Sequence, residues 1–169
     1  MDESGFMLRP CLVRTWAPRG QTPTLLSYDR RDRLSVISAI TVSPVRKRVG
    51  LYFEMLRHNV KTADVVRFMR ALRRKVGRRV RFVLDGLPAH KGAQRVLQDK
   101  GYGFVRLPAY APDLNPDEWV WRQAKYVELR NTAHYNLDGL EHSVSQALLN
   151  IGARPRLLRG FFRAAGLSL

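Results

Sequence analysis

The sequence predicts an α/β domain in which a mixed sheet is flanked by helices, and the distribution of apolar residues is what predicts it. The first two thirds of the chain alternate segments rich in Val, Ile and Thr with segments whose apolar residues recur at helical spacing. The last third carries only the helical spacing. Two strands, then helix–strand–helix–strand, then helices, is the order of a layered α/β domain.

Four segments read as strands. Arg33–Ser43 and Arg48–Met55 are rich in β-branched residues and are joined by a short turn around Pro44, so we expect them to pair antiparallel. Arg79–Asp85 has a nearly continuous apolar end, which is typical of a buried central strand. Gly103–Leu107 is the fourth strand.

The helices are predicted from apolar stripes and from proline placement. Lys61–Val76 carries one apolar stripe with arginines on its other side, and a helix is expected over Gly92–Lys100. Pro116 suits the first position of a helix that runs to about Leu129. Two further helices are predicted over Leu137–Ile151 and around Leu157–Phe162. This order of elements is compatible with a ribonuclease-H-like sheet.

Composition bounds the class of protein. The chain has 169 residues, of which 45% are hydrophobic, so it suits one domain with a sizeable core and is too apolar for disorder. Its single cysteine, Cys11, excludes a disulfide framework and a Cys-rich zinc site. No apolar run reaches bilayer-spanning length, and the acidic start Met1-Asp2-Glu3 is unlike a signal peptide. We therefore expect a single domain over residues 1–169, in the cytoplasm and away from the membrane.

The charge balance points to a polyanion as partner. The formal net charge is +16, and 24 of the 30 basic residues are arginine, whose guanidinium matches phosphate geometry. Neutralising phosphates releases counterions, which drives binding to nucleic acids. A GC-rich coding bias would explain the ratio of Arg to Lys but not the surplus of positive charge. Nucleic-acid binding is therefore favoured over a merely solvated basic surface.

Two acidic residues stand at the ends of predicted elements. Asp85 ends the apolar strand in VLDGLPAHK (Val83–Lys91), where open α/β sheets place their ligand sites, although an Asp there also caps turns. Glu118 lies in the first helical turn of YAPDLNPDEWVW (Tyr110–Trp121), where Asn115 and Glu118 have the spacing of a capping box. Carboxylates that converge at one sheet edge repel unless a divalent cation holds them, and two Mg²⁺ ions on such a cluster make a phosphoryl-transfer site.

The two motifs together resemble the second and third acidic motifs of the DDE-superfamily endonuclease domain of mariner-related bacterial insertion-sequence transposases. The start DESGF, with WAPRGQTP (Trp16–Pro23) behind it, looks like the first acidic motif of that family, and RGFFRAAGL (Arg159–Leu167) also looks familial. The resemblance spans essentially the whole chain. It implies a ribonuclease-H-like fold, cleavage of transposon ends by hydrolysis, and transfer of the freed 3′-hydroxyl to target DNA.

By the same resemblance, the catalytic and metal-binding triad falls on Asp2, Asp85 and Glu118, which would bind two Mg²⁺ or Mn²⁺ ions. The implied partner is double-stranded DNA, both transposon ends and target, in an active homodimer associated with the bacterial nucleoid.

Neighbouring residues in the motifs are weaker candidates for contacts with DNA. They are His90 and Lys91 near Asp85, and Arg122 and Lys125 on the helical face of Glu118. For His90, orienting a carboxylate and lying at a solvent-exposed turn are the alternatives. Asn115 is expected to cap its helix, Trp119 and Trp121 to pack in the core or an interface, and Cys11 to be inert.

The chain departs from the family pattern at its start. The helix-turn-helix region expected upstream is absent from residues 1–169, and so is the half-strand that should precede Asp2. We therefore expect a truncated first strand in which Asp2 frays, because termini are poorly ordered unless they are paired. Glu3 is a poor substitute, because alternation along a strand points it to the opposite face. These features predict a catalytic-half reading frame or a remnant, which acts only when fused by frameshifting to, or assembled with, an upstream DNA-binding segment.

Two alternatives stay open from the sequence. One is a catalytically inactive remnant that only binds DNA. The other is another ribonuclease-H-like nuclease, such as a resolvase or an RNA–DNA hybrid nuclease, which the long YAPDLNPDEWVW motif argues against.

Overall fold

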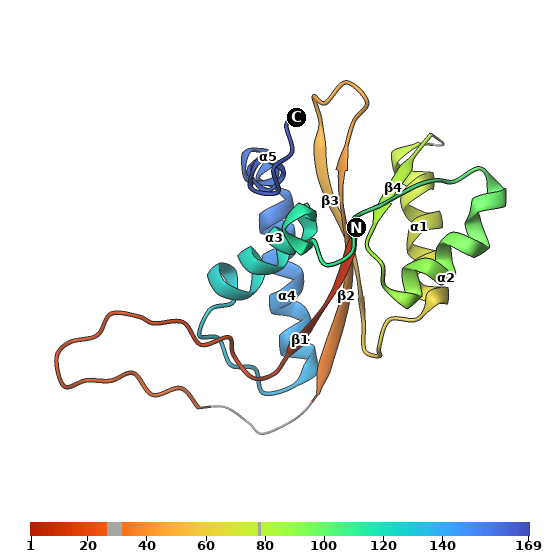
Figure 1. Ribbon diagram of the computed structural model, residues 1–169. Coiled ribbons are helices and arrows are strands. Elements are labelled where there is room, and N and C mark those ends of the chain that lie inside the picture. Colours follow the sequence, from red (N-terminus) through yellow and green to blue (C-terminus); the bar gives the residue numbers. More distant parts are fainter. Residues whose placement is uncertain (27–31, 78) are drawn as a thin grey trace.

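The computed structural model describes residues 1–26, 32–77 and 79–169 (Figure 1). Its strands form two ladders, an antiparallel one in the order β1-β2-β3 and a parallel pair β4-β5. The expected antiparallel pairing on either side of Pro44 is confirmed, as is the α/β class. The strands are β1 (Asp2–Met7), β2 (Arg33–Val42), β3 (Val49–Leu56), β4 (Arg81–Leu84) and β5 (Gly103–Arg106).

The helices lie where the apolar stripes predict them, with shifted ends. The helix expected from Gly92 begins at Pro88, because proline suits a first helical position, and a 3₁₀ turn then ends at Gly101, whose φ of 72° is left-handed. The helix that begins at Pro116 continues into a π-helical turn that the spacing did not predict. The helices are α1 (Thr62–Val76), α2 (Pro88–Leu97), α3 (Pro116–Gln123), α4 (Leu137–Gly152) and α5 (Pro155–Ala164), and the short turns are η1 (Gln98–Lys100), η2 (Pro112–Leu114) and η3 (Ala124–Glu128).

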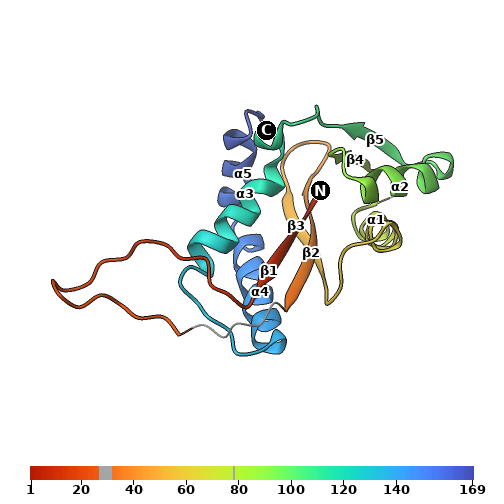
Figure 2. The same cartoon turned by 60° about the horizontal axis from the view of Figure 1, so that its bottom comes forward.

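The antiparallel sheet lies between two helical layers. Helices α1 and α2 cover one face, and α3, α4 and α5 cover the other (Figures 1 and 2). Strand β2 is therefore buried on both faces: Val36 packs with α3, α4 and α5, whereas its neighbour Ile37 packs with α1 and α2. A strand buried on both faces needs apolar residues at successive positions, which explains the apolar run of β2.

The two ladders meet at the start of the chain. The amino nitrogen of Met1 donates a hydrogen bond of 3.0 Å to the carbonyl of Val83 in β4, which sets the beginning of β1 beside the end of β4. In β4, Phe82 and Leu84 pack with α1 and α2, but Val83 is 41% exposed. The expectation of a strand buried on both faces is therefore wrong for β4, because its outward face is left to solvent.

The chain stays with the body of the domain as far as Val13, whose backbone N–H donates to Asn131 Oδ1. The segment 14–26 then leads away from it (Figure 1) and carries an almost fully exposed Trp16. Among the described residues, no helix combines the length and apolar character needed to cross a bilayer.

Candidate active site

The three predicted acidic ligands come from three elements. Asp2 is the first residue of β1, Asp85 directly follows β4, and Glu118 lies in the first turn of α3. Asp85 acts electrostatically on Glu118, and Glu118 acts on Asp2. Because Asp2 pairs with Ser38 in the middle of β2, this region lies beside the middle of the antiparallel sheet. As they stand, no three His, Cys, Asp or Glu side chains within the described part of the chain are close enough to surround a metal ion.

Asp2 is held firmly, contrary to the expectation that it frays. It pairs with Ser38 of β2, its side chain is buried, and its Oδ2 accepts a hydrogen bond of 3.1 Å from the indole nitrogen of Trp121. The backbone N–H of Glu3 donates to Oδ1 at 2.8 Å. Burial, then repulsion from the carboxylates of Asp117 and Glu118, raises the pKa of Asp2 to about 7. The position of Asp2 is thus fixed by its pairing with β2 and by its contact with α3. Neither can be predicted from the sequence of the terminus alone.

A buried carboxylate next to the predicted ligand ties α3 to the sheet, and the sequence did not single it out. Asp117 accepts a hydrogen bond of 2.6 Å from Ser38 Oγ and lies 3.1 Å from the amino nitrogen of Met1. Asn115 caps the helix as expected, by accepting from the N–H of Asp117 at 3.2 Å. A signal in the sequence was Ser38, a polar residue in a largely apolar strand that also contains Ser35 and Thr41.

The side chain of Glu118 has neighbours other than Asn115, the residue that caps its helix. Its carboxyl group faces Asp2, Asp85 and Lys125. Burial, against the opposing charge of Lys125 and with repulsion from Asp85 and Asp117, raises the pKa of Glu118 above its ordinary value. Two of the three candidate ligands therefore carry raised pKa values, chiefly through burial and in smaller part through nearby like charges.

Asp85 combines the two interpretations that the sequence left open. Its Oδ1 accepts from the backbone N–H of Leu87 at 3.1 Å, as a turn-capping Asp does, and lies 2.5 Å from His90 Nδ1. Both contacts fall on Oδ1, so within the described residues Oδ2 has no hydrogen-bond partner. Burial raises the pKa of Asp85, but the contacts with His90 and Leu87 outweigh it and set the pKa below its ordinary value.

His90 is not placed to touch DNA. Its side chain is 1% exposed, and its Nε2 lies 2.8 Å from Glu3 Oε2 on β1, an ion-pair contact too bent for a well-formed hydrogen bond. Burial lowers the pKa of His90, but Asp85 and Glu3 outweigh it and raise the pKa to about 9. We therefore do not assign a phosphate contact to His90. Its contacts agree with the alternative, in which it orients a carboxylate. Glu3 does face away from Asp2, as strand alternation predicts.

A cleft of about 660 Å³ opens beside Glu118. Lys125 is half-buried there, with its Nζ 2.7 Å from Ser4 Oγ, and burial lowers its pKa. Arg122 stacks over the ring of Trp119 at 5.1 Å. Trp121 is buried and meets Phe6 edge-on, which confirms the packing predicted for it.

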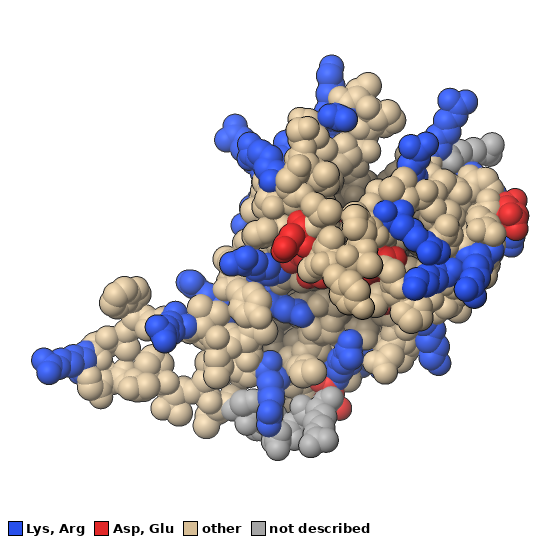
Figure 3. Space-filling view, viewed as in Figure 1, with Lys and Arg blue, Asp and Glu red and all other residues tan. Residues whose placement is uncertain are grey.

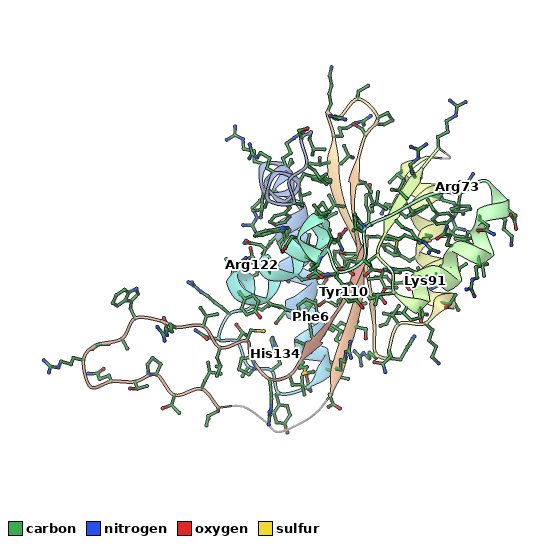
Figure 4. The ribbon with its side chains drawn as sticks, in the orientation of Figure 1. Phe6, Arg73, Lys91, Tyr110, Arg122 and His134 are labelled. Atoms are coloured by element: carbon green, nitrogen blue, oxygen red, sulfur yellow. The ribbon has the colours of Figure 1, made fainter. Side chains whose placement is uncertain are left out.

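Positive charge surrounds this region. Lys and Arg side chains are spread over the face shown in Figure 3, whereas acidic side chains are few and show over α3, near the centre, at the outer edge beyond α2 and at the lower margin. Arg122 and Lys91 lie on opposite sides of the sheet, on α3 and α2 (Figure 4), and both are exposed. The region of the candidate acidic ligands is thus flanked by exposed cations on both sides of the sheet.

Comparisons with known proteins identify the family and the fold. The sequence model of the DDE superfamily endonuclease matches residues 1–141. The Mos1 mariner paired end complex with Mn has a TM-score of 0.67 and 19% identity over 98% of this chain and 50% of that chain. The Mos1 strand transfer complex has a TM-score of 0.63 and 18% identity over 97% and 49%. A pre-cleavage Mos1 transpososome has a TM-score of 0.63 and 16% identity over 97% and 50%.

The chain thus spans about half the length of the Mos1 chains it matches, and at these identities the likeness shows the shared ribonuclease-H-like fold. No curated protein sequence matches it. The family match covers most of the chain and includes all three predicted acidic motifs, so this protein belongs to the DDE superfamily endonuclease family.

Proposed function

We propose that this domain is the catalytic part of a transposase, which cuts DNA strands at transposon ends and joins them to target DNA with divalent metal ions. The observation that carries the proposal is that the carboxyl groups of Asp2 and Asp85, from two other elements, both influence that of Glu118, beside a cleft whose lining includes Arg122 and Lys125. Carboxylates on separate elements of this fold suit a reaction that needs metal ions and little covalent chemistry from the protein.

The donor set fits hard divalent cations. Mg²⁺ and Mn²⁺ prefer carboxylate oxygens, and Asp85 Oδ2 has no partner within the described residues. Burial is the main cause of the raised pKa values of Asp2 and Glu118, and repulsion between carboxylates adds a smaller contribution, which a bound cation would relieve. Two bound ions would activate the attacking water or hydroxyl group and stabilise the leaving 3′ oxygen.

The cations of the cleft would hold the DNA backbone. Lys125 is fixed by Ser4 and lies close enough to Glu118 to affect its charge, so we assign it to the phosphate nearest the acidic residues. Arg122, on the same helical face, and Lys91, on α2, would contact phosphates on either side. Each of these contacts positions the duplex and carries no sequence information.

The assembly is part of the proposal. We propose an active homodimer on double-stranded DNA, in which a helix-turn-helix segment also binds the DNA, and a place on the bacterial nucleoid. The firm hold on Asp2 makes a competent site in this domain compatible with such an arrangement.

Nicking of supercoiled plasmid in Mg²⁺ or Mn²⁺ tests the proposal. The chain should nick DNA when joined to a DNA-binding segment, and Asp85→Asn and Glu118→Gln should each lower the rate by at least about a hundredfold while leaving thermal unfolding intact. Asp99→Asn, an exposed acidic residue on η1, is the matched control and should keep full activity. Activity that survives both active-site changes would contradict the site assignment.

The remaining alternatives make different predictions in the same assay. An inactive remnant would bind DNA but nick nothing with either ion. A hybrid nuclease would prefer RNA–DNA duplexes over DNA duplexes, so the two substrates are compared side by side.

A further inference from the structure

Next to the proposed ligands, a histidine is enclosed between two carboxylates from different strands. His90 is 1% exposed; its Nδ1 lies 2.5 Å from Asp85 Oδ1 and its Nε2 lies 2.8 Å from Glu3 Oε2. The three groups link α2, the end of β4 and the start of β1. None of the reaction steps proposed above uses Glu3 or His90.

Packing alone does not account for this histidine. The other buried residues of α2, Ala93 and Leu97, are apolar and face the core formed with α1. A leucine at the buried position of His90 would fill such a site without desolvating an imidazole and a glutamate. A polar group at this depth needs partners. Asp85 meets Nδ1 at hydrogen-bond distance, whereas Glu3 meets Nε2 as an ion-pair contact without a well-formed hydrogen bond. The arrangement therefore indicates that the histidine is there to hold the carboxylates in position and not to fill the core.

The contacts restrict how Asp85 can rotate. His90 Nδ1 and the N–H of Leu87 both meet Oδ1, from the side of the turn that begins α2. With Oδ1 held by two groups, the carboxyl plane is set and Oδ2 is directed away from them. An aspartate that follows a strand would otherwise turn about its side-chain bonds.

The same chain of contacts reaches the other candidate ligand through the backbone. Glu3 follows Asp2 in β1, and strand alternation sends Asp2 towards Trp121 of α3 and Glu3 towards His90 of α2. One short stretch of strand therefore holds Asp2 directly and Asp85 through His90.

We infer that Glu3 and His90 are positioning residues, which fix Asp85 relative to Asp2 so that both carboxylates meet the same divalent cations. The inference rests on the proposed function and deepens it. It assigns no contact with DNA to either residue. Outer residues that orient metal ligands contribute about 10- to 100-fold to metal affinity, which gives the scale of the expected effect.

Mn²⁺ binding to the full chain, measured by electron paramagnetic resonance, tests the inference. Glu3→Gln keeps the size of the side chain and removes its charge, and it should weaken Mn²⁺ binding about tenfold. His90→Asn retains a donor near the position of Nδ1 and loses the link to Glu3, so its Mn²⁺ affinity should fall by a similar factor. Because Glu3 acts only through His90, the double variant should be no weaker than His90→Asn alone.

Two readouts separate positioning from general support of the fold. In plasmid nicking, the Mn²⁺ concentration for half-maximal rate should rise in Glu3→Gln, while the rate at saturating Mn²⁺ recovers to within a fewfold of wild type. The ring ¹⁵N resonances of His90 should shift in Glu3→Gln without metal. Glu54→Gln, which removes a charge on β3 that pairs with Arg67, is the matched control and should change neither.

The outcomes are distinct. Unchanged Mn²⁺ affinity in Glu3→Gln, or an equal loss in Glu54→Gln, overturns the inference and leaves the proposed function standing. Additive losses in the double variant overturn it as well. If His90→Asn does not fold, Glu3→Gln decides alone. Absence of Mn²⁺ binding by the wild-type chain overturns the proposed function, and this inference with it.

Discussion

Asp2 and Glu3 are neighbours in β1 that serve opposite faces of one sheet. Asp2 faces α3 and is held by Trp121, whereas Glu3 faces α2 and meets His90. Strand alternation alone sets this division, and it places two adjacent carboxylates in different surroundings. Burial and like charges raise the pKa of Asp2, and the nearby histidine lies within ion-pair distance of Glu3. The two carboxylates therefore have different electrostatic surroundings although they are adjacent in the sequence.

The pKa of Asp2 predicts how metal binding depends on pH. Because that pKa is raised to about 7, a cation must displace a proton at lower pH, so Mn²⁺ affinity should fall about tenfold per pH unit below 7 and level off above it. Titrations between pH 5 and 8.5 measure this. In Asp2→Asn the profile should lose this step; an unchanged profile would contradict the assignment.

The same shift has a consequence for stability without metal. A carboxyl whose pKa is higher in the folded state binds more protons there than in the unfolded chain. The free energy of unfolding should therefore decrease, through this group, as pH rises from about 4 to about 7. Urea unfolding of wild type and Asp2→Asn across this range separates the contribution of Asp2 from those of other groups.

At the scale of elements, the placement of Asp85 and His90 depends on how α2 packs against α1. The helices approach closely at Gly92, where an added Cβ would lie 2.6 Å from Thr62 Oγ1 and 2.8 Å from its Cγ2. A residue without a side chain is needed there because the two helices cross at that point. The carboxyl end of β4 and the start of α2 are thereby fixed to the layer beneath them.

Gly92→Ala should therefore lower the free energy of unfolding by about 1–3 kcal/mol, the usual cost of overpacking. Thr62→Ala removes Oγ1 and Cγ2 and should restore most of the loss in the double variant. Gly160→Ala in α5 is the control, since nothing lies within 4 Å of its added Cβ, and alanine favours helix, so stability should hold or rise. Chemical denaturation of the wild type, the three single variants and the double variant measures these free energies of unfolding. Equal effects at Gly92 and Gly160 would contradict the packing argument.

The elements also show what could be predicted from sequence. Strand β2 and helix α1 follow from periodicity, because their apolar residues report burial directly. The exposed face of β4 and the π-helical turn of η3 do not, because they depend on which neighbours cover a strand and on how a helix adjusts to its contacts. For the site, the motifs located Asp85 and Glu118, but only the folded chain brings Glu3 to His90 or buries Asp117.

Over the whole molecule, a small acidic centre lies inside a strongly basic domain. The net charge of +16 favours long-range attraction of DNA, and the cations of the cleft lie beside the carboxylates that would otherwise repel phosphates. The two helical layers pack on the sheet, and the three candidate acidic ligands come from the start of β1, the residue after β4 and the first turn of α3. In the proposed function, the basic residues bind the DNA and the acidic residues support its cleavage.

Mn²⁺ affinity in three single variants tests the central claim most directly. Asp2→Asn, Asp85→Asn and Glu118→Gln should each weaken Mn²⁺ binding to the full chain by at least about tenfold, whereas the exposed Asp99→Asn should bind as wild type does. That result would mean that one cation site draws on all three elements. Wild-type affinity in Asp85→Asn or Glu118→Gln would contradict the account, because the carboxylates would then not act together.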